Sequence, residues 1–224
     1  MKVTILQFPG TNCEYDTKQA FESLGATTEI LWHKSDEIPS DTNLLVVAGG
    51  FSYGDYLRSG AIAKFSPVMQ AVIKYANEGG RVLGICNGFQ VLAEAGLLPG
   101  ALMRNSGLHF LSKHHYLKVI NNNNLFLKEL DNGDIVNLPI AHHDGNYFIN
   151  DDELKELYSN NQVLLKYSDK DGNESNPNGS VDSIAGVCNI EKNVFGLMPH
   201  PERAMELLLG SNDGVKMLRG FLTA

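Results

Sequence analysis

The stretch RVLGICNGFQVLAEAG (residues 81–96) decides the fold, because an apolar strand pattern runs directly into a helical one. RVLGI (81–85) is typical of a buried strand, and the following ten residues repeat their apolar side chains at helical spacing. Gly84 and Gly88 flank Cys86 in a G-x-C-x-G pattern. Such a pattern indicates a nucleophile elbow, a sharp strand-to-helix turn that exposes its central residue.

The same alternation of strands and helices extends over the first hundred residues. Parallel strands need crossover connections, so this order predicts an α/β fold with a mostly parallel central sheet flanked by helices, similar to a flavodoxin-like sandwich. The predicted strands are VTILQF (3–8), TEILWH (28–33) and LLVVA (44–48); one predicted helix is capped by Asn12 and ends at Gly25, and another opens at Ser66 and Pro67 and ends at Gly79. Shorter β-prone pieces follow from about residue 108. We find no clear linker and expect a single domain over residues 1–224.

Composition excludes several classes of protein. Of 224 residues, 43% are hydrophobic, which is ordinary for a globular chain, and the net charge of −8 with no basic run disfavours a nucleic-acid partner. We see no apolar run of about 18 residues that would span a membrane. Three cysteines without metal-ligand spacing disfavour a disulfide framework and fit a reducing cytoplasm.

Cys86 is the candidate nucleophile of this chain. At the elbow it would lie beside the N-terminus of a helix, whose partial positive charge favours the thiolate. The alternative is a buried structural cysteine. A nucleophilic thiol needs a base and the base an orienting group, and MPHPE (198–202) offers both in His200 and Glu202. Prolines on both sides of His200 predict an extended segment in which the two side chains point the same way. Taken alone, this motif is also compatible with a solvated histidine.

The segment AGGFSYGDYLRSG (48–60) follows a predicted strand and is rich in glycine. The backbone N–H of Gly50 and that of Asn87, directly after the nucleophile, are the natural pair of donors for an oxyanion. A phosphate-binding loop is the alternative, but the segment fits neither common glycine pattern. Without a Walker motif the chain offers no evident nucleotide site of its own.

Five segments together resemble the class I glutamine amidotransferases, the triad-type glutaminases. The resemblance runs over nearly the whole chain and is carried by FPGTNCE (8–14), GGFSYGDYLRSGAIA (49–63), GICNGFQVL (84–92), NPNGS (176–180) and GLMPHPER (196–203). It implies that Cys86 attacks the side-chain amide of L-glutamine, that His200 acts as base and then acid, and that Glu202 orients His200. It also places Gln90 and Phe51 at the substrate.

Within that family the motifs look like those of the glutaminase subunits of purine synthesis. This implies a large synthetase partner that uses ATP and magnesium to aminate formylglycinamide ribonucleotide, and a small bridging subunit. We therefore expect no cofactor and no metal in this chain. Free ammonia would be wasted, so we expect weak activity in the isolated chain.

The sequence departs from the resemblance at one motif. The family commonly reads H-G-E-G-R-Y where this chain has HHDGNY (142–147), with a shorter acid and no arginine. A metal site in HHD (142–144) is disfavoured because neighbouring residues of a strand face opposite sides. We interpret Cys13, Cys188 and the histidines at 109, 114 and 115 as packing or surface residues. The remaining alternatives are another cysteine-elbow hydrolase, such as a γ-glutamyl hydrolase or a DJ-1/PfpI relative, and an inert docking subunit.

Overall fold

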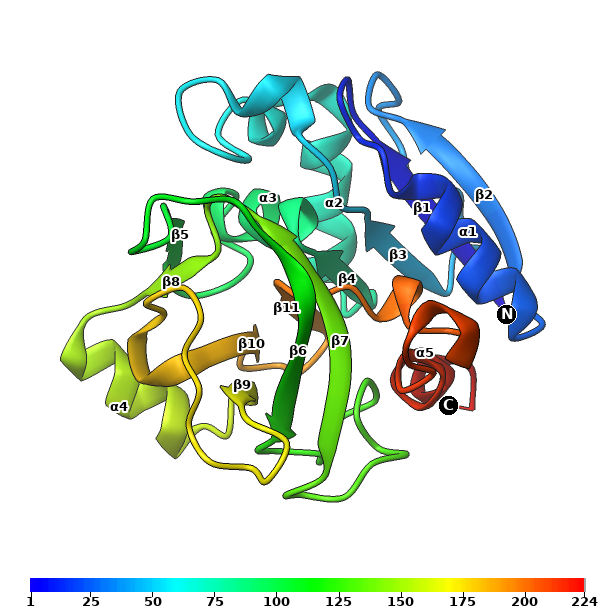
Figure 1. Ribbon diagram of the computed structural model, residues 1–224. Helices are drawn as coiled ribbons and strands as arrows, with labels where there is room; N and C mark the ends of the chain where they lie inside the picture. Colours follow the sequence, from blue (N-terminus) through cyan, green and yellow to red (C-terminus); the bar gives the residue numbers. More distant parts are fainter. Residues whose placement is uncertain (224) are drawn as a thin grey trace.

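A nine-stranded sheet forms the centre of the computed structural model, which describes residues 1–223 (Figure 1). The strand order is β2-β1-β3-β4-β11-β10-β9-β6-β7, and β5 and β8 form a separate pair. The strands are β1 (Lys2–Gln7), β2 (Thr27–Trp32), β3 (Leu44–Val47), β4 (Val82–Ile85), β5 (Ala101–Met103), β6 (Leu111–Val119), β7 (Ile135–His142), β8 (Asn146–Phe148), β9 (Val163–Ser168), β10 (Ile184–Cys188) and β11 (Val194–Leu197).

The α/β fold predicted from the sequence is confirmed. Neighbouring strands are parallel from β2 through β1, β3 and β4 to β11, and antiparallel from β11 to β7. The α-helices are α1 (Glu14–Ser23), α2 (Pro67–Asn77), α3 (Asn87–Glu94), α4 (Asp151–Ser159) and α5 (Gly214–Leu222), and the 3-10 helices are η1 (Ser52–Asp55), η2 (Ala63–Phe65), η3 (Val181–Ser183), η4 (Pro201–Arg203) and η5 (Leu207–Leu209).

One predicted helix start is wrong. The residue before α1 is Cys13, not Asn12, and no side chain caps this helix by a hydrogen bond. The loop containing both residues is held instead by the β3 side of the sheet, where the N–H groups of Asn12 and Cys13 point at the Gly49 carbonyl at 3.4 and 3.1 Å. Tertiary contacts have therefore displaced the local capping preference.

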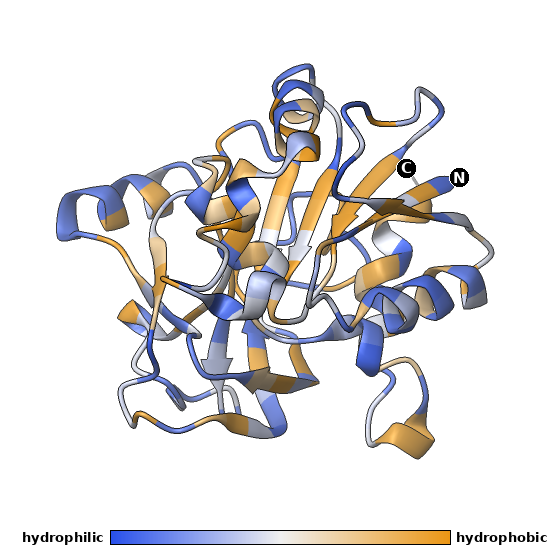
Figure 2. Cartoon of the chain, turned by 90° about the horizontal axis from the view of Figure 1, so that it is seen from above, coloured by the Kyte–Doolittle hydropathy of each residue, from blue (hydrophilic) through white to orange (hydrophobic). Residues whose placement is uncertain are grey.

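Burial explains why the middle of the sheet is so regular. Every residue of β3, β4 and β11 is buried, as expected for strands covered on both faces. Figure 2 shows these central strands as hydrophobic, whereas the outer helices carry much of the hydrophilic surface. The apolar core therefore covers both faces of β3, β4 and β11, the strands that lead to the turn between β4 and α3.

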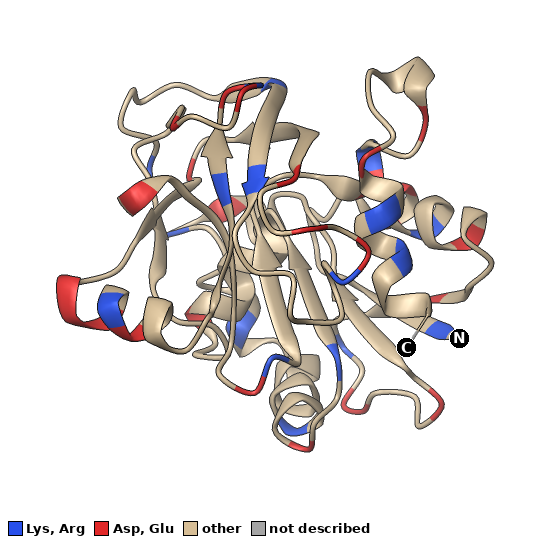
Figure 3. Cartoon of the chain, turned by 90° about the horizontal axis from the view of Figure 1, so that it is seen from below, with Lys and Arg blue, Asp and Glu red and all other residues tan. Residues whose placement is uncertain are grey.

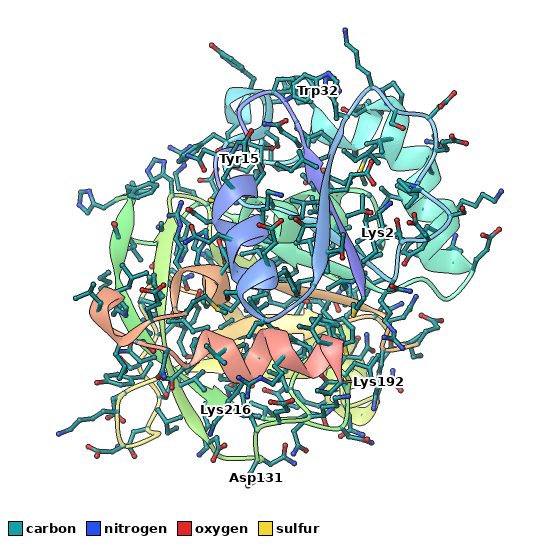
Figure 4. The ribbon with its side chains drawn as sticks, turned by 90° about the vertical axis from the view of Figure 1, so that its right-hand side faces the viewer. Lys2, Tyr15, Trp32, Asp131, Lys192 and Lys216 are labelled. Atoms are coloured by element: carbon teal, nitrogen blue, oxygen red, sulfur yellow. The ribbon has the colours of Figure 1, made fainter. Side chains whose placement is uncertain are left out.

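The outer surface is charged but mixed. Lys and Arg alternate with Asp and Glu around the periphery in Figure 3. On the side seen in Figure 4, α1, which carries Tyr15, and α5, which carries Lys216, lie together, and both contact η4. Within residues 1–223 no helix has the length and apolar character needed to span a membrane.

Candidate active site

Cys86 lies at a strained turn between β4 and α3. Its backbone has φ 50° and ψ −105°, in the left-handed region that residues with a side chain rarely adopt. The glycines on both sides are required by space. A Cβ on Gly84 would lie 2.6 Å from Leu92 Cδ1, and one on Gly88 would lie 1.8 Å from the Val47 carbonyl oxygen. The elbow therefore depends on a close approach of backbone that only glycine permits.

Three neighbouring parallel strands bring the predicted site residues to one edge of the sheet. β3 pairs with β4 and β4 with β11, with Val47 beside Gly84 and Ile85 beside Leu197. These strands lead, at their carboxyl ends, to three parts of the site: the glycine-rich segment 48–60 (the glycine loop), Cys86, and the segment before His200. Open parallel sheets bind their ligands at this edge.

His200 and Glu202 form a buried hydrogen-bonded pair. The ring Nδ1 of His200 lies 2.7 Å from Glu202 Oε1, and the backbone N–H of His200 donates to the Pro139 carbonyl at 2.9 Å. Burial disfavours the imidazolium, but the Glu202 carboxylate and the Cys86 sulfur outweigh it and raise the pKa of His200 well above its ordinary value. His200 is therefore placed to hold a proton next to the thiol.

The predicted extended geometry of this segment is wrong in detail. Pro201 begins the one-turn helix η4, so Glu202 sits in a 3-10 turn and not in a strand. Proline is preorganised for the first position of a helix, which explains the turn. The 3-10 turn still brings the Glu202 carboxylate to the His200 imidazole, with 2.7 Å between Oε1 and Nδ1.

Both predicted oxyanion donors are available. No hydrogen bond among residues 1–223 uses the Gly50 N–H, and the Asn87 N–H opens α3, where the first N–H groups have no partner in the helix. Gly50 has φ 150°, and a Cβ there would lie 2.7 Å from both Asn12 N and Thr11 Cα. A side chain at this position would push the glycine loop away from its neighbour.

The side chains of Asn87 and Gln90 connect this site to its surroundings. Asn87 Oδ1 accepts from Ser52 N at 3.0 Å, and Asn87 Nδ2 donates to Gln90 Oε1 at 2.8 Å. Gln90 Nε2 in turn donates to the Asp144 carbonyl at 2.7 Å. The glycine loop, α3 and the loop after β7 thus share one chain of hydrogen bonds.

Cys86 and His200 line the same open cavity of about 240 Å³, together with Gly50 and Phe51. Cys86 is 5% exposed, and its thiol donates weakly to the Ala141 carbonyl at 3.6 Å. Phe51 is 43% exposed and faces the ring of Phe110 at 6.4 Å between centroids. The cavity therefore has an apolar rim above a polar floor.

Two side chains from other parts of the chain hold Asp144, the acid of the altered motif after β7. Arg104, in the segment after β5, donates to Asp144 Oδ1 at 3.1 Å, and Ser59 donates to the other oxygen at 2.8 Å. Asp55 lies nearby, and burial together with the charge of Asp144 raises its pKa to about 6. The sequence did not indicate Arg104. It reaches Asp144 because β5 pairs with β8, which places Met103 beside Asn146.

The two histidines of that motif lie in separate environments. His142 Nδ1 donates to Asn105 Oδ1 at 3.1 Å, whereas His143 Nε2 faces the Leu108 carbonyl at 3.3 Å. Burial, and then the nearby His200, lowers the pKa of His142 to about 4. His142 is therefore a neutral structural residue that orders the loop containing Asp144.

Cys13 is a residue whose position the sequence did not reveal. Its thiol lies 3.2 Å from Arg203 Nη2 and donates to Asn12 Oδ1 at 3.1 Å, and it lines the same cavity as Cys86. The interpretation of Cys13 as an apolar packing residue is wrong, because its neighbours are polar and charged. Cys188 does pack as expected, buried in β10.

A thiol on an elbow and a buried histidine line one cavity, a carboxylate is hydrogen-bonded to that histidine, and two backbone N–H groups near the thiol are free within the described residues. These features define the class of triad-type cysteine amidotransferases. Comparison with known proteins agrees. The model of the CobB/CobQ-like glutamine amidotransferase domain matches residues 1–214. A protein of Sulfurimonas denitrificans named phosphoribosylformylglycinamidine synthase subunit PurQ is 80% identical over the full length of both chains.

More distant relatives carry the same name. The PurQ subunit of Wolinella succinogenes is 62% identical and covers 98% of this chain and 99% of its own. A chain in the structure of PurLQS from Thermotoga maritima superimposes with a TM-score of 0.89 at 40% identity, covering 99% of this chain and 97% of the other. The chain belongs to the glutamine amidotransferase family and, within it, to the PurQ subunits of phosphoribosylformylglycinamidine synthase.

Proposed function

We propose that this chain is the glutaminase subunit of phosphoribosylformylglycinamidine synthase. It would release ammonia from L-glutamine and deliver it to a synthetase partner that aminates formylglycinamide ribonucleotide in purine biosynthesis. The observation that carries this proposal is the joint presence of Cys86 and His200 in one cavity, with Glu202 hydrogen-bonded behind the imidazole.

The reaction begins at sulfur. The Cys86 thiol gives its proton to His200, and the sulfur attacks the amide carbon of the glutamine side chain. Negative charge collects on the former carbonyl oxygen, where the N–H groups of Gly50 and Asn87 stabilise it. His200 then protonates the leaving nitrogen, the carbon–nitrogen bond breaks, and ammonia departs from a γ-glutamyl thioester.

The second half restores the enzyme. Water gives a proton to His200 and attacks the thioester, and the same backbone donors hold the second oxyanion. Collapse breaks the carbon–sulfur bond, releases glutamate and returns the proton to Cys86. Glu202 stays bound to Nδ1 throughout and keeps the other ring nitrogen directed at the reacting atoms.

The partners and surroundings follow from the same proposal. We infer a large synthetase subunit that binds ATP and magnesium, a small bridging subunit, and a cytoplasmic location for the complex, with no cofactor held by this chain. The net charge of −8 and the three free cysteines are compatible with it. We also infer that the isolated chain turns over glutamine more slowly than the complex does.

The test compares glutamine-dependent synthesis, which needs both subunits, with ammonia-dependent synthesis, which needs only the synthetase. In the assembled complex, Cys86→Ala is expected to abolish synthesis with glutamine but to leave synthesis with added ammonia nearly intact. Cys188→Ala is the matched control, since Cys188 is buried in β10 and absent from the lining of the cavity. A glutamine-like electrophile should label Cys86 alone of the three cysteines by mass spectrometry. Loss of both activities in Cys86→Ala would contradict the proposal.

A further inference from the structure

A second thiol lies next to the imidazole and carboxylate of the site. The Sγ of Cys13, a ring nitrogen of His200 and a carboxylate oxygen of Glu202 all lie within 4.8 Å of one another, and all three residues are buried. Cys13 comes from the loop after β1 and the other two from the segment after β11. The proposed glutaminase reaction uses the last two and leaves the Cys13 thiol without a role.

Two polar atoms of this cluster have no partner. Among the described residues, neither His200 Nε2 nor Glu202 Oε2 forms a hydrogen bond, although His200 is 2% exposed and Glu202 is 4% exposed. Buried polar atoms are normally satisfied, so both residues keep an atom that no group within residues 1–223 uses; an ion held by both would have to displace the 2.7 Å hydrogen bond between His200 Nδ1 and Glu202 Oε1. Gly49 makes room beside them: a Cβ there would lie 3.0 Å from His200 Cε1 and 3.1 Å from Cys13 Sγ.

The donor set is one that zinc prefers. Sulfur, imidazole nitrogen and carboxylate oxygen bind Zn²⁺ at about 2.3, 2.0 and 2.1 Å in tetrahedral geometry, whereas Ca²⁺ and Mg²⁺ take oxygen ligands. Three protein ligands leave one position open, and Cys86 lines the same cavity. Tetrahedral coordination needs the ligand atoms closer together than 4.8 Å, so the three side chains would have to shift toward the ion.

The charges nearby act on this ion in opposite directions, since the Glu202 carboxylate attracts a cation and the Arg203 guanidinium repels it. Arg203 Nη2 lies 3.2 Å from Cys13 Sγ and favours the thiolate that a metal requires. Burial opposes ionisation and raises the pKa of Cys13. Binding would therefore release to solvent both the Cys13 thiol proton and the extra proton that His200 carries as an imidazolium, and affinity should increase with pH.

We propose that Cys13, His200 and Glu202 form a site for Zn²⁺ or a similar soft divalent cation, and that its occupation switches the glutaminase off. The ion would take the imidazole and carboxylate away from Cys86, so base and orienting group are lost together. Inhibition rests on the proposed function, whereas binding does not.

Binding is tested without catalysis. The full chain carrying Cys86→Ala, reduced and free of oxygen, is titrated with Co²⁺ as a spectroscopic substitute for Zn²⁺. Two further variants in this background are compared: one adds Cys13→Ala, and the other adds Cys188→Ala as the matched control for loss of a buried thiol. Circular dichroism checks that all three are folded.

We expect Cys86→Ala and its Cys188→Ala derivative to bind one Co²⁺ with a sulfur-to-metal charge-transfer band, which Zn²⁺ abolishes by displacement. Adding Cys13→Ala should remove the band and weaken binding at least about tenfold. The site is refuted if Cys86→Ala shows no sulfur band, or if the band survives removal of Cys13.

Inhibition is tested on the native nucleophile. Zn²⁺ inhibition constants are measured for the parent chain and for Cys13→Ala, each relative to its own uninhibited glutaminase rate. We expect the constant to rise at least about tenfold in Cys13→Ala. Equal inhibition of both would place the metal on Cys86 and overturn the switch. If no chain hydrolysed glutamine, the proposed function would fail while the Co²⁺ result stood.

Discussion

Substitution of Gly50 by alanine tests the oxyanion donor directly. The new Cβ would lie 2.7 Å from Asn12 N and Thr11 Cα and 2.9 Å from the Gly10 carbonyl oxygen. All three are backbone atoms, so no side chain can move aside, and residues 49–51 must shift by several tenths of an ångström. Donors act on an oxyanion at about 2.7–3.1 Å, and a shift of this size takes the Gly50 N–H out of that range.

The expected loss follows from the value of one such donor. Removing it typically costs about 10²–10³ in kcat, or about 3–4 kcal/mol of barrier. The crowding should also lower stability by about 1–3 kcal/mol. Glutamine-dependent synthesis by the complex should therefore fall by two to three orders of magnitude, whereas synthesis with ammonia should stay near the parent rate.

Gly25→Ala is the matched control for backbone strain. Gly25 has φ 89°, also unfavourable for alanine, but a Cβ there would meet nothing within 4 Å. This variant should lose stability and keep its turnover with glutamine. The reasoning would be refuted if Gly50→Ala, shown to be folded by its thermal midpoint, kept kcat within about threefold of the parent, since that is under 1 kcal/mol.

Three further predictions concern other parts of the site and the core. Glu202→Gln should lower kcat by about 10²–10⁴, because the imidazole of His200 loses its orienting carboxylate, and the pKa of His200 read from the pH profile should fall; an unchanged profile would contradict this. His142 has its pKa lowered to about 4, so the unfolded chain takes up its proton first as the pH falls. Stability from this group is present above about pH 6.5 and should decrease by about 3 kcal/mol by pH 4, at about 1.4 kcal/mol per pH unit; urea unfolding of the parent and of His142→Asn should show a smaller pH slope in the variant. In Gly88→Ala the Cβ would lie 1.8 Å from a β3 carbonyl oxygen, which should destabilise the fold by about 3 kcal/mol or more, whereas Gly96→Ala, with nothing within 4 Å, should lose far less in the same unfolding measurement.

The parallel half of the fold was predictable because its signals are local. Strands β1, β3 and β4 are short apolar runs, and the glycines around Cys86 mark a turn that only such residues permit. Most strands after residue 108 were also recognised as β-prone pieces, but β8 was not. Their order in the sheet was not, since pairing of β6 with both β7 and β9 depends on contacts far apart in sequence.

The parts of the site that were missed share one cause. Cys13 meets His200 because β1 pairs with β3, which places the loop after β1 beside the glycine loop. Arg104 meets Asp144 because β5 pairs with β8. Neither pairing leaves a periodic trace in the chain. Local patterns therefore gave the elbow and the His-x-Glu motif, whereas the residues that surround them required the strand order.

The position of β11 affects how the protein folds while it is being synthesised on the ribosome. β11 inserts between β4 and β10, so the two halves of the sheet cannot join until Val194–Leu197 has emerged. Contacts of such long sequence separation form slowly. A nascent polypeptide thus carries its sulfur nucleophile without a base from the synthesis of residue 86 to that of residue 200, about half of translation, and the enzyme stays inactive until β11 and the segment after it arrive.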